Sequence, residues 1–204
     1  MTAPQPISPA GLVEALVTRV MALPRTLTVA VDGAPSTEPE VLASSLVSAL
    51  RDLGRPAAHV YAETFWRDAS IRLEYGREDI DAFLDWLDAP ALRREVLDRL
   101  QRDGTYLPSL RDPRTNRATR AEPQPLVGGV VVISGALLLR HGLDFDLAVH
   151  LAASPAALAR RTAAELLWTL PAFARYAAES RPANSADVVV RCDDPRHPAV
   201  LGLP

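Results

Sequence analysis

The chemistry of this chain is suggested first by residues 31–46, which read VDGAPSTEPEVLASSL and follow an apolar run. A strand, a glycine turn and a helix start are the parts of a phosphate-binding loop, whose pattern is G-x-x-x-x-G-K-[ST]. When Gly33 takes the first position, the second glycine, the lysine and the hydroxyl positions hold Glu38, Pro39 and Glu40. Each carboxylate about 4 Å from a bound phosphate charge would cost roughly 4 kcal/mol at an effective dielectric near 20. The segment therefore predicts a glycine turn that does not hold ATP in the ordinary way.

The same residues have a purely structural interpretation. Thr37-Glu38-Pro39-Glu40 matches a capping box, in which Thr37 accepts from the N–H of Glu40 and the Glu40 carboxylate reaches back to the N–H of Thr37. Pro39 also removes one backbone donor from the helix start, where phosphate binding relies on free N–H groups. This pattern predicts a helix that caps itself.

Composition limits the classes of function. The chain has 204 residues, 48% of them hydrophobic, which is enough for one sizeable core and predicts a single domain over residues 1–204. The net charge of −3 favours neither nucleic acid nor an anionic membrane as a partner. Lysine is absent, so no lysine elsewhere substitutes for the missing one. Cys192 is the only cysteine, and no apolar run is long enough to span a membrane, so we expect a cytoplasmic protein.

The elements that would position these residues alternate along the chain. Short valine-rich runs predict strands at residues 27–31, 57–62, 129–134, 146–151 and 187–190, and periodic apolar patterns predict helices at 39–53, 90–101 and 155–167. Residues 1–24 hold an N-terminal helix that begins at Ser8-Pro9. Buried strands alternating with helices indicate the α/β class, a doubly wound, mostly parallel sheet with helices on both faces. Residues 103–124 are predicted to form a long loop.

From residue 27 to residue 190 the chain resembles the uridine kinase-like P-loop kinases, whose loop reads roughly VDG-x-x-GAGKTT. In VYAETFWRD, Glu63 matches the family's catalytic base and Trp66 one of the aromatic residues that follow it. Asp88 in WLDAPALRREVLDRL matches a ribose-contacting aspartate, and YLPSLRDPRTNR matches the base-pocket segment, with Asp112 retained and Asn116 near a usual histidine. The resemblance implies a P-loop NTPase-like three-layer fold and a nucleoside-like small molecule as substrate.

Several positions depart from the family pattern. Ser134 replaces the acidic residue that ends the strand at 129–134. The lid region at 154–181 is reduced: it keeps Arg160, but the family's later Arg-Asp pair falls at Ala164-Glu165. Gly33, Ser36, Thr37 and Arg160 are the residues left to bind a nucleotide, and we expect no metal site. Because phosphoryl transfer depends on positioning and on charge stabilisation, these losses weaken ordinary kinase chemistry.

Each candidate residue also has a structural alternative. Glu63 is a general base or an exposed strand-end carboxylate, Asp88 fits a helix N-cap, and Arg160 fits a solvated surface arginine. Trp66 fits a packing anchor as well as a base-stacking residue. Beyond the carboxyl ends of the strands we expect a polar crevice.

Three functions follow. The first is a uridine kinase-like protein with a degenerate loop, which needs no cofactor and binds a ligand or a protein partner. The second is a nucleoside kinase that uses Mg-ATP, or GTP, through a non-standard phosphate site. The third is a structural subunit, a homodimer or the partner of an active paralogue.

Overall fold

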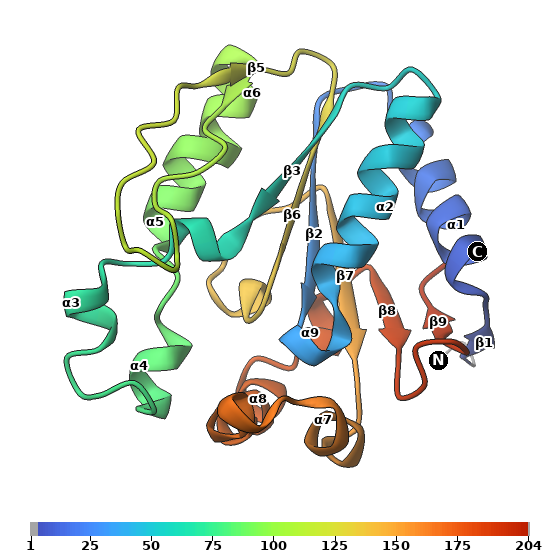
Figure 1. Ribbon diagram of the computed structural model, residues 1–204. Helices are drawn as coiled ribbons and strands as arrows, with labels where there is room; N and C mark the ends of the chain where they lie inside the picture. Colours follow the sequence, from blue (N-terminus) through green and yellow to red (C-terminus); the bar gives the residue numbers. More distant parts are fainter. Residues whose placement is uncertain (1–3, 204) are drawn as a thin grey trace.

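The computed structural model describes residues 4–203 as a seven-stranded sheet with helices on both faces (Figure 1). The sheet order is β1-β9-β8-β7-β2-β6-β3, and β8, β7, β2, β6 and β3 run parallel. These five are the predicted strands, observed at Leu27–Gly33 (β2), Ala57–Tyr61 (β3), Val130–Gly135 (β6), Leu147–Ala152 (β7) and Val188–Arg191 (β8). The α/β class and the mostly parallel, doubly wound sheet are thus confirmed.

Two short strands extend the sheet beyond β8 at one side. The strand β9 (Ala199–Leu201) pairs antiparallel with β8, and β1 (Gln5–Pro6) pairs antiparallel with β9. Neither strand is predicted from the sequence, because runs of two and three residues carry no measurable periodicity. The strands β4 (Thr105–Tyr106) and β5 (Gln124–Pro125) form a separate two-stranded ribbon.

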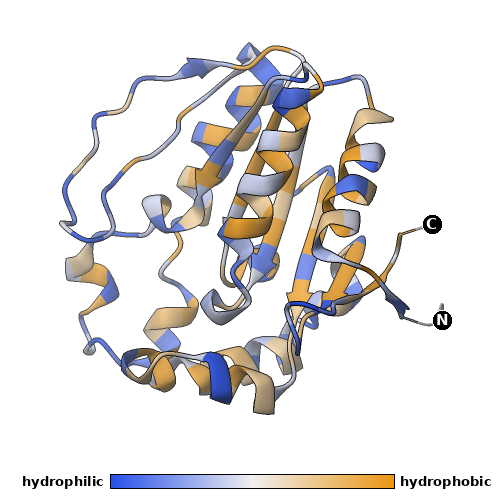
Figure 2. Ribbon diagram, turned by 45° about the vertical axis from the view of Figure 1, so that its right-hand side comes forward, coloured by the Kyte–Doolittle hydropathy of each residue, from blue (hydrophilic) through white to orange (hydrophobic). Residues whose placement is uncertain are grey.

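Successive side chains of the central strands point alternately into two hydrophobic cores, one on each face of the sheet. Leu27, Val29 and Val31 of β2 pack with α1 (Pro9–Met21) and α2 (Pro39–Asp52), whereas Ala30 faces the helical run at residues 89–103. That run comprises α5 (Ala89–Leu92), a π-helical segment (Arg93–Asp98) and α6 (Arg99–Asp103). Figure 2 shows the hydrophobic residues concentrated in the central strands and on the inward faces of the helices. These three layers bury all of β2, and all of β6 except its last residue, Gly135, as continuous apolar strands require.

Local capping signals read from the sequence are present in the fold. Ser8 caps α1 by accepting from the N–H of Gly11 at 3.0 Å, with Pro9 in the first turn.

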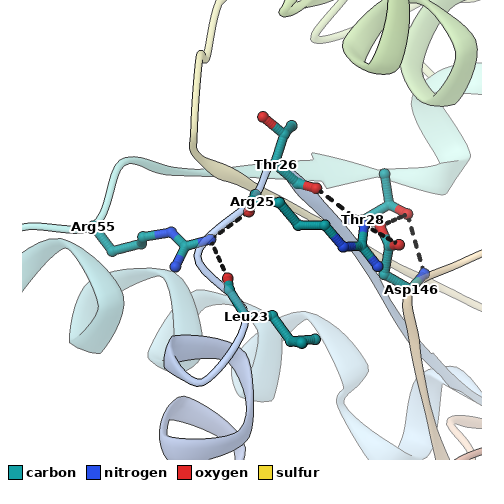
Figure 3. Close-up of polar contacts among 6 residues, drawn as sticks. All are labelled: Leu23, Arg25, Thr26, Thr28, Arg55 and Asp146. Carbon is teal, nitrogen blue, oxygen red and sulfur yellow. Dashed lines mark hydrogen bonds and ion pairs between the residues drawn. The ribbon is translucent and has the colours of Figure 1, made fainter.

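Polar residues at the amino ends of the strands also have partners. Arg25 pairs with Asp146 at 2.6 Å, and the same carboxylate accepts from the N–H of Thr28 at 2.8 Å (Figure 3). Arg55 donates to the carbonyl of Leu23 at 2.9 Å, which joins the end of α2 to the turn before β2.

The carboxyl edge of the sheet is covered by several short helices (Figure 1). The predicted helix at 155–167 is instead α7 (Pro155–Arg161), a 3-10 segment (Ala164–Thr169) and α8 (Leu170–Glu179), followed by α9 (Pro182–Ser185). The helices α3 (Ala69–Arg72) and α4 (Ile80–Leu84) precede α5, and α4 packs beside α8. Among residues 4–203, no helix is long and apolar enough to cross a membrane.

Candidate functional site

The loop after β2 is folded tightly upon itself. Residues Pro35–Thr37 form a 3-10 turn in which the amides of Thr37 and Glu38 donate to the carbonyls of Ala34 and Pro35, at 2.8 and 3.0 Å. Pro35 and Pro39 have no N–H to offer. Four of the six residues from 34 to 39 therefore present no free amide to a ligand.

The predicted capping box is wrong. The Thr37 hydroxyl donates back to the Ala34 carbonyl at 2.7 Å, and Glu38, not Thr37, is the N-cap of α2, with no side-chain capping bond. The right-handed helical region is disfavoured for a residue that precedes proline, and here α2 begins at Pro39. Glu38 adopts the left-handed conformation instead, with φ 57° and ψ 51°.

The conformation of Glu38 is the one that a glycine at this position would favour. A residue with a Cβ loses about 1–2 kcal/mol in the left-handed region. We expect Glu38→Gly to raise the free energy of unfolding by about 0.5–1 kcal/mol, because strain relief exceeds the added backbone entropy. The measurement is equilibrium urea unfolding.

Glu14→Gly is a matched control for this prediction, because Glu14 is also exposed but lies inside α1. The same substitution should there lower stability by about 1 kcal/mol, the usual cost of glycine within a helix. Equal effects at the two positions would contradict the assigned strain at Glu38.

Gly33, the last residue of β2, is held in a space without room for a side chain. A Cβ at this position would meet Thr37 Oγ1, and it would lie 2.9 Å from the Cβ of Leu151 on β7. Ser36 is half-buried, and its hydroxyl accepts from that of Thr162, just after α7, at 3.4 Å. The loop after β2 is thus packed against β7 and the residue that follows α7.

Glu63 lies directly after β3, in a 3-10 segment (Ala62–Phe65), at the carboxyl edge of the sheet. Glu63 is exposed at the surface, but desolvation by its surroundings, and then the nearby carboxylate of Glu40 at the start of α2, raise its pKa above the ordinary value. The long loop comes to the same place, since the amides of Leu110 and Arg111 donate to the carbonyl of Thr64 at 3.2 and 3.0 Å. The carboxylates of Glu63 and Glu40, from segments distant in the sequence, therefore lie near each other at the carboxyl edge of the sheet.

A histidine and two serines lie beneath α2. His59 Nε2 is 2.8 Å from Ser134 Oγ on the neighbouring strand β6, and its Nδ1 is 3.2 Å from Ser44 Oγ of α2. Burial lowers the pKa of His59 to about 4. Ser134 is therefore engaged by a neutral histidine.

The low pKa of His59 predicts a pH dependence of stability. Its folded pKa, about 4, lies below the ordinary 6.5, so between these values the unfolded chain binds the proton more readily. The free energy of unfolding should therefore fall as the pH drops from 6.5 toward 4, and burial of His141 acts in the same direction. Urea unfolding at pH 7 and pH 5 measures the fall, which should be smaller in His59→Gln.

His197→Gln is the control for this dependence, because His197 is exposed and pairs with Asp194 on the surface. That variant should retain the wild-type difference between pH 7 and pH 5. An NMR titration that gave His59 a pKa near 6.5 would contradict the prediction.

The sequence analysis did not single out Asp32, which lies in β2 and is fully buried. Its carboxylate accepts from the N–H of Leu138 at 2.8 Å and from the Tyr176 hydroxyl at 2.9 Å, and it lies 2.6 Å from Nδ1 of His150. Burial, and then Asp32, raise the pKa of Tyr176, which keeps the phenol protonated. An acid within an otherwise apolar strand was the only signal in the sequence for this cluster.

A third hydrophobic cluster lies at the carboxyl edge, where the sequence suggested a polar crevice. It joins Ala34 of the loop to Phe83, Trp86 and residues of α8 such as Phe173. Trp66 and Trp168 pack against it. The rings of Phe83 and Trp86 meet edge to face at 5.0 Å, which is a favourable aromatic geometry. Residues 164–179 are thereby packed onto α4 and the loop after β2.

The remaining predicted residues are dispersed around this edge. Asp88 caps α5, accepting from Ala91 N at 3.0 Å, and Asp112 accepts from Arg114 N at 2.8 Å within the long loop. Asn116 accepts from Ala69 N at 2.9 Å and so supports α3. Arg160 is exposed on α7 and makes none of the ion pairs found among residues 4–203. The sequence-predicted nucleotide and substrate residues are therefore not gathered into one contact set.

Comparison with known proteins gives a fold but no close relative. No protein-family model matches the chain, and none of the curated proteins does. A possible uridine kinase from Bacillus stearothermophilus superposes with a TM-score of 0.71 at 19% identity, covering 87% of this chain and 96% of that one. A proposed fructose transport system kinase from Silicibacter sp. TM1040 gives a TM-score of 0.59 at 21% identity, with coverages of 88% and 95%. The chain thus has the fold of the uridine kinase-like P-loop kinases.

Proposed function

We propose that this chain is a uridine kinase-like protein that lacks ordinary ATP-dependent phosphotransfer and instead binds a small ligand or a protein partner. One observation carries the proposal: the loop after β2 uses the amides of Thr37 and Glu38 within its own turn, and it has prolines at 35 and 39. A phosphate bound at a helix start needs those N–H groups.

The charges near the loop support the same proposal. Glu40 lies in the first turn of α2 and close enough to Glu63 to raise its pKa. A triphosphate placed there would face two carboxylates with no lysine to offset them. Ser134, bound to His59, supplies no carboxylate to organise Mg²⁺.

Isothermal titration calorimetry with Mg-ATP and Mg-GTP tests the proposal. We expect no binding at micromolar nucleotide, and micromolar affinity for either nucleotide would contradict it. The triple variant Glu38→Gly, Pro39→Lys, Glu40→Thr is a useful comparison, because it restores the standard loop residues at positions 38–40. Binding by this variant alone would locate the loss of affinity in these three positions.

A second function is favoured by the placement of Glu63. Its raised pKa and its position after β3 suit a general base in a nucleoside kinase with a non-standard phosphate site. The test is transfer of labelled phosphate from Mg-ATP to uridine or cytidine. Glu63→Gln should abolish such transfer, whereas Glu122→Gln, in the exposed part of the long loop, should not. Transfer that persists in Glu63→Gln would remove Glu63 from the mechanism.

A further inference from the structure

A hollow away from the loop after β2 lies between α3 and α4, with a volume of about 460 Å³. That volume is within the range of small-molecule sites, roughly 300–1,000 Å³. Its wall includes Arg67, Arg72 and Tyr75, together with acidic residues before, within and just after α4. None of the nucleotide-binding residues predicted from the sequence lines it.

Arg72 is the unusual member of this wall, because its side chain is buried and only 7% of the residue is exposed. Its guanidinium lies against the rings of Trp66 and Trp86, 5.0 and 4.7 Å from their centroids. Nε donates to the carbonyl of Arg67 at 2.8 Å, but the two terminal nitrogens have no hydrogen-bond or ion-pair partner among residues 4–203. The two terminal nitrogens of Arg72, held in a fixed planar geometry, are thus left to donate to an oxyanion.

The neighbouring carboxylates do not satisfy Arg72. Asp68 interacts with it electrostatically, but its oxygens pair with Arg111 at 3.0 Å and accept from the N–H of Ser70 at 2.9 Å. In the hollow itself, Asp81 pairs with Arg175, and Asp79 caps α4 by accepting from Ala82 N at 2.7 Å. The terminal nitrogens of Arg72 therefore reach solvent with their N–H donors free of partners in the described part of the chain, and they are available to an oxyanion of a ligand.

The acidic side chains also restrict the kind of anion. Glu74, Asp79, Asp81 and Asp85 line the same hollow, so a dianionic phosphate would meet more repulsion than a single carboxylate. Carboxylate oxygens are acceptors, and they suit a ligand that carries hydroxyl donors. Tyr75, of which 75% is exposed, offers an apolar ring at the opening.

We propose that this hollow binds a small hydroxylated monocarboxylate, such as a sugar acid. The ligand carboxylate pairs with the terminal nitrogens of Arg72, and its hydroxyls donate to carboxylates such as Glu74 and Asp79. The Arg67 guanidinium adds positive charge at the same wall. This goes beyond the proposed function, because it names a ligand class and a site that does not involve the phosphate loop.

Gluconate is the probe that tests the proposal, measured by calorimetry and by tryptophan fluorescence. We expect saturable binding with a change in emission, because Trp66 and Trp86 lie directly against the guanidinium. Glucose, which has the hydroxyls without the carboxylate, should not bind. Glucose 6-phosphate should bind about tenfold more weakly than gluconate because of its second charge. Arg72→Gln should weaken gluconate binding about tenfold or more, the loss of a charged pair of hydrogen bonds.

Arg77→Gln is the matched control, since Arg77 is exposed, lies five residues from Arg72 and does not line the hollow. It should bind gluconate like the wild type. If Arg72→Gln does not fold, judged by circular dichroism, Arg67→Ala and Tyr75→Ala replace it, and each should weaken binding about threefold. The proposal is overturned if gluconate fails to bind, if a folded Arg72 variant binds it unchanged, or if glucose 6-phosphate binds more tightly. Nucleotide calorimetry is unaffected by these outcomes, so the two proposals fail separately.

Discussion

Replacing Asp32 with alanine is expected to lower the free energy of unfolding by about 3–5 kcal/mol, the cost of removing one partner from a buried charged network. The carboxylate is fully buried and serves three groups, the amide of Leu138, the hydroxyl of Tyr176 and the imidazole of His150. Without Asp32 these groups stay buried and lose their acceptor, and each unsatisfied group costs roughly 1–3 kcal/mol. Urea unfolding followed by tryptophan fluorescence measures the loss.

A double-mutant cycle shows whether the loss arises in this network. Tyr176→Phe alone should cost about 1–2 kcal/mol, the value of one buried hydrogen bond to a charged acceptor. In the Asp32→Ala background it should cost less, because the hydroxyl no longer has its partner. Asp144→Ala is the control: its side chain is 93% exposed and pairs only with Arg93, so no measurable change is expected. An Asp32→Ala variant as stable as Asp144→Ala would refute the network.

Replacing Phe83 with alanine should cost about 3–5 kcal/mol, the usual range for removing a buried phenyl ring. The ring lies edge to face with Trp86, Trp168 and Phe173, at centroid distances of 5.0, 5.2 and 6.0 Å. Because these partners come from α8, the 3-10 segment before it and the chain just after α4, the loss should loosen the packing of α8 against α4. Urea unfolding gives the total, and amide hydrogen exchange should show reduced protection in α8 first.

Tyr75→Ala is the control for this prediction, since it removes an aromatic ring of which 75% is exposed. It should leave both the unfolding midpoint and the exchange of α8 unchanged. If Phe83→Ala behaved in the same way, the third hydrophobic cluster would not hold α8 in place.

The sequence predicted the central strands because continuous valine-rich runs require burial on both faces, and burial of this kind is available in a parallel sheet. It also predicted local contacts, such as Ser8 capping α1 and Asp88 capping α5, because capping depends on residues three positions apart. That Glu38, Pro39 and Glu40 follow Gly33 at the spacing where the pattern G-x-x-x-x-G-K-[ST] has glycine, lysine and a hydroxyl residue is likewise read from the sequence alone.

The capping box predicted at residues 37–40 was wrong because two local preferences conflicted there. Thr37 satisfies the capping-box pattern, but its hydroxyl donates to the Ala34 carbonyl, and Glu38, in the left-handed region before Pro39, is the N-cap of α2. Two short-range preferences conflicted, and the pattern did not indicate which one would prevail.

Other features were decided only by tertiary structure. Asp32 meets His150 and Tyr176, which are 118 and 144 residues away in the chain. The aromatic packing of α4 against α8 and the unsatisfied guanidinium of Arg72 depend equally on how distant segments are brought together. Sequence periodicity reports which face of an element is buried, whereas these contacts depend on what that face is buried against.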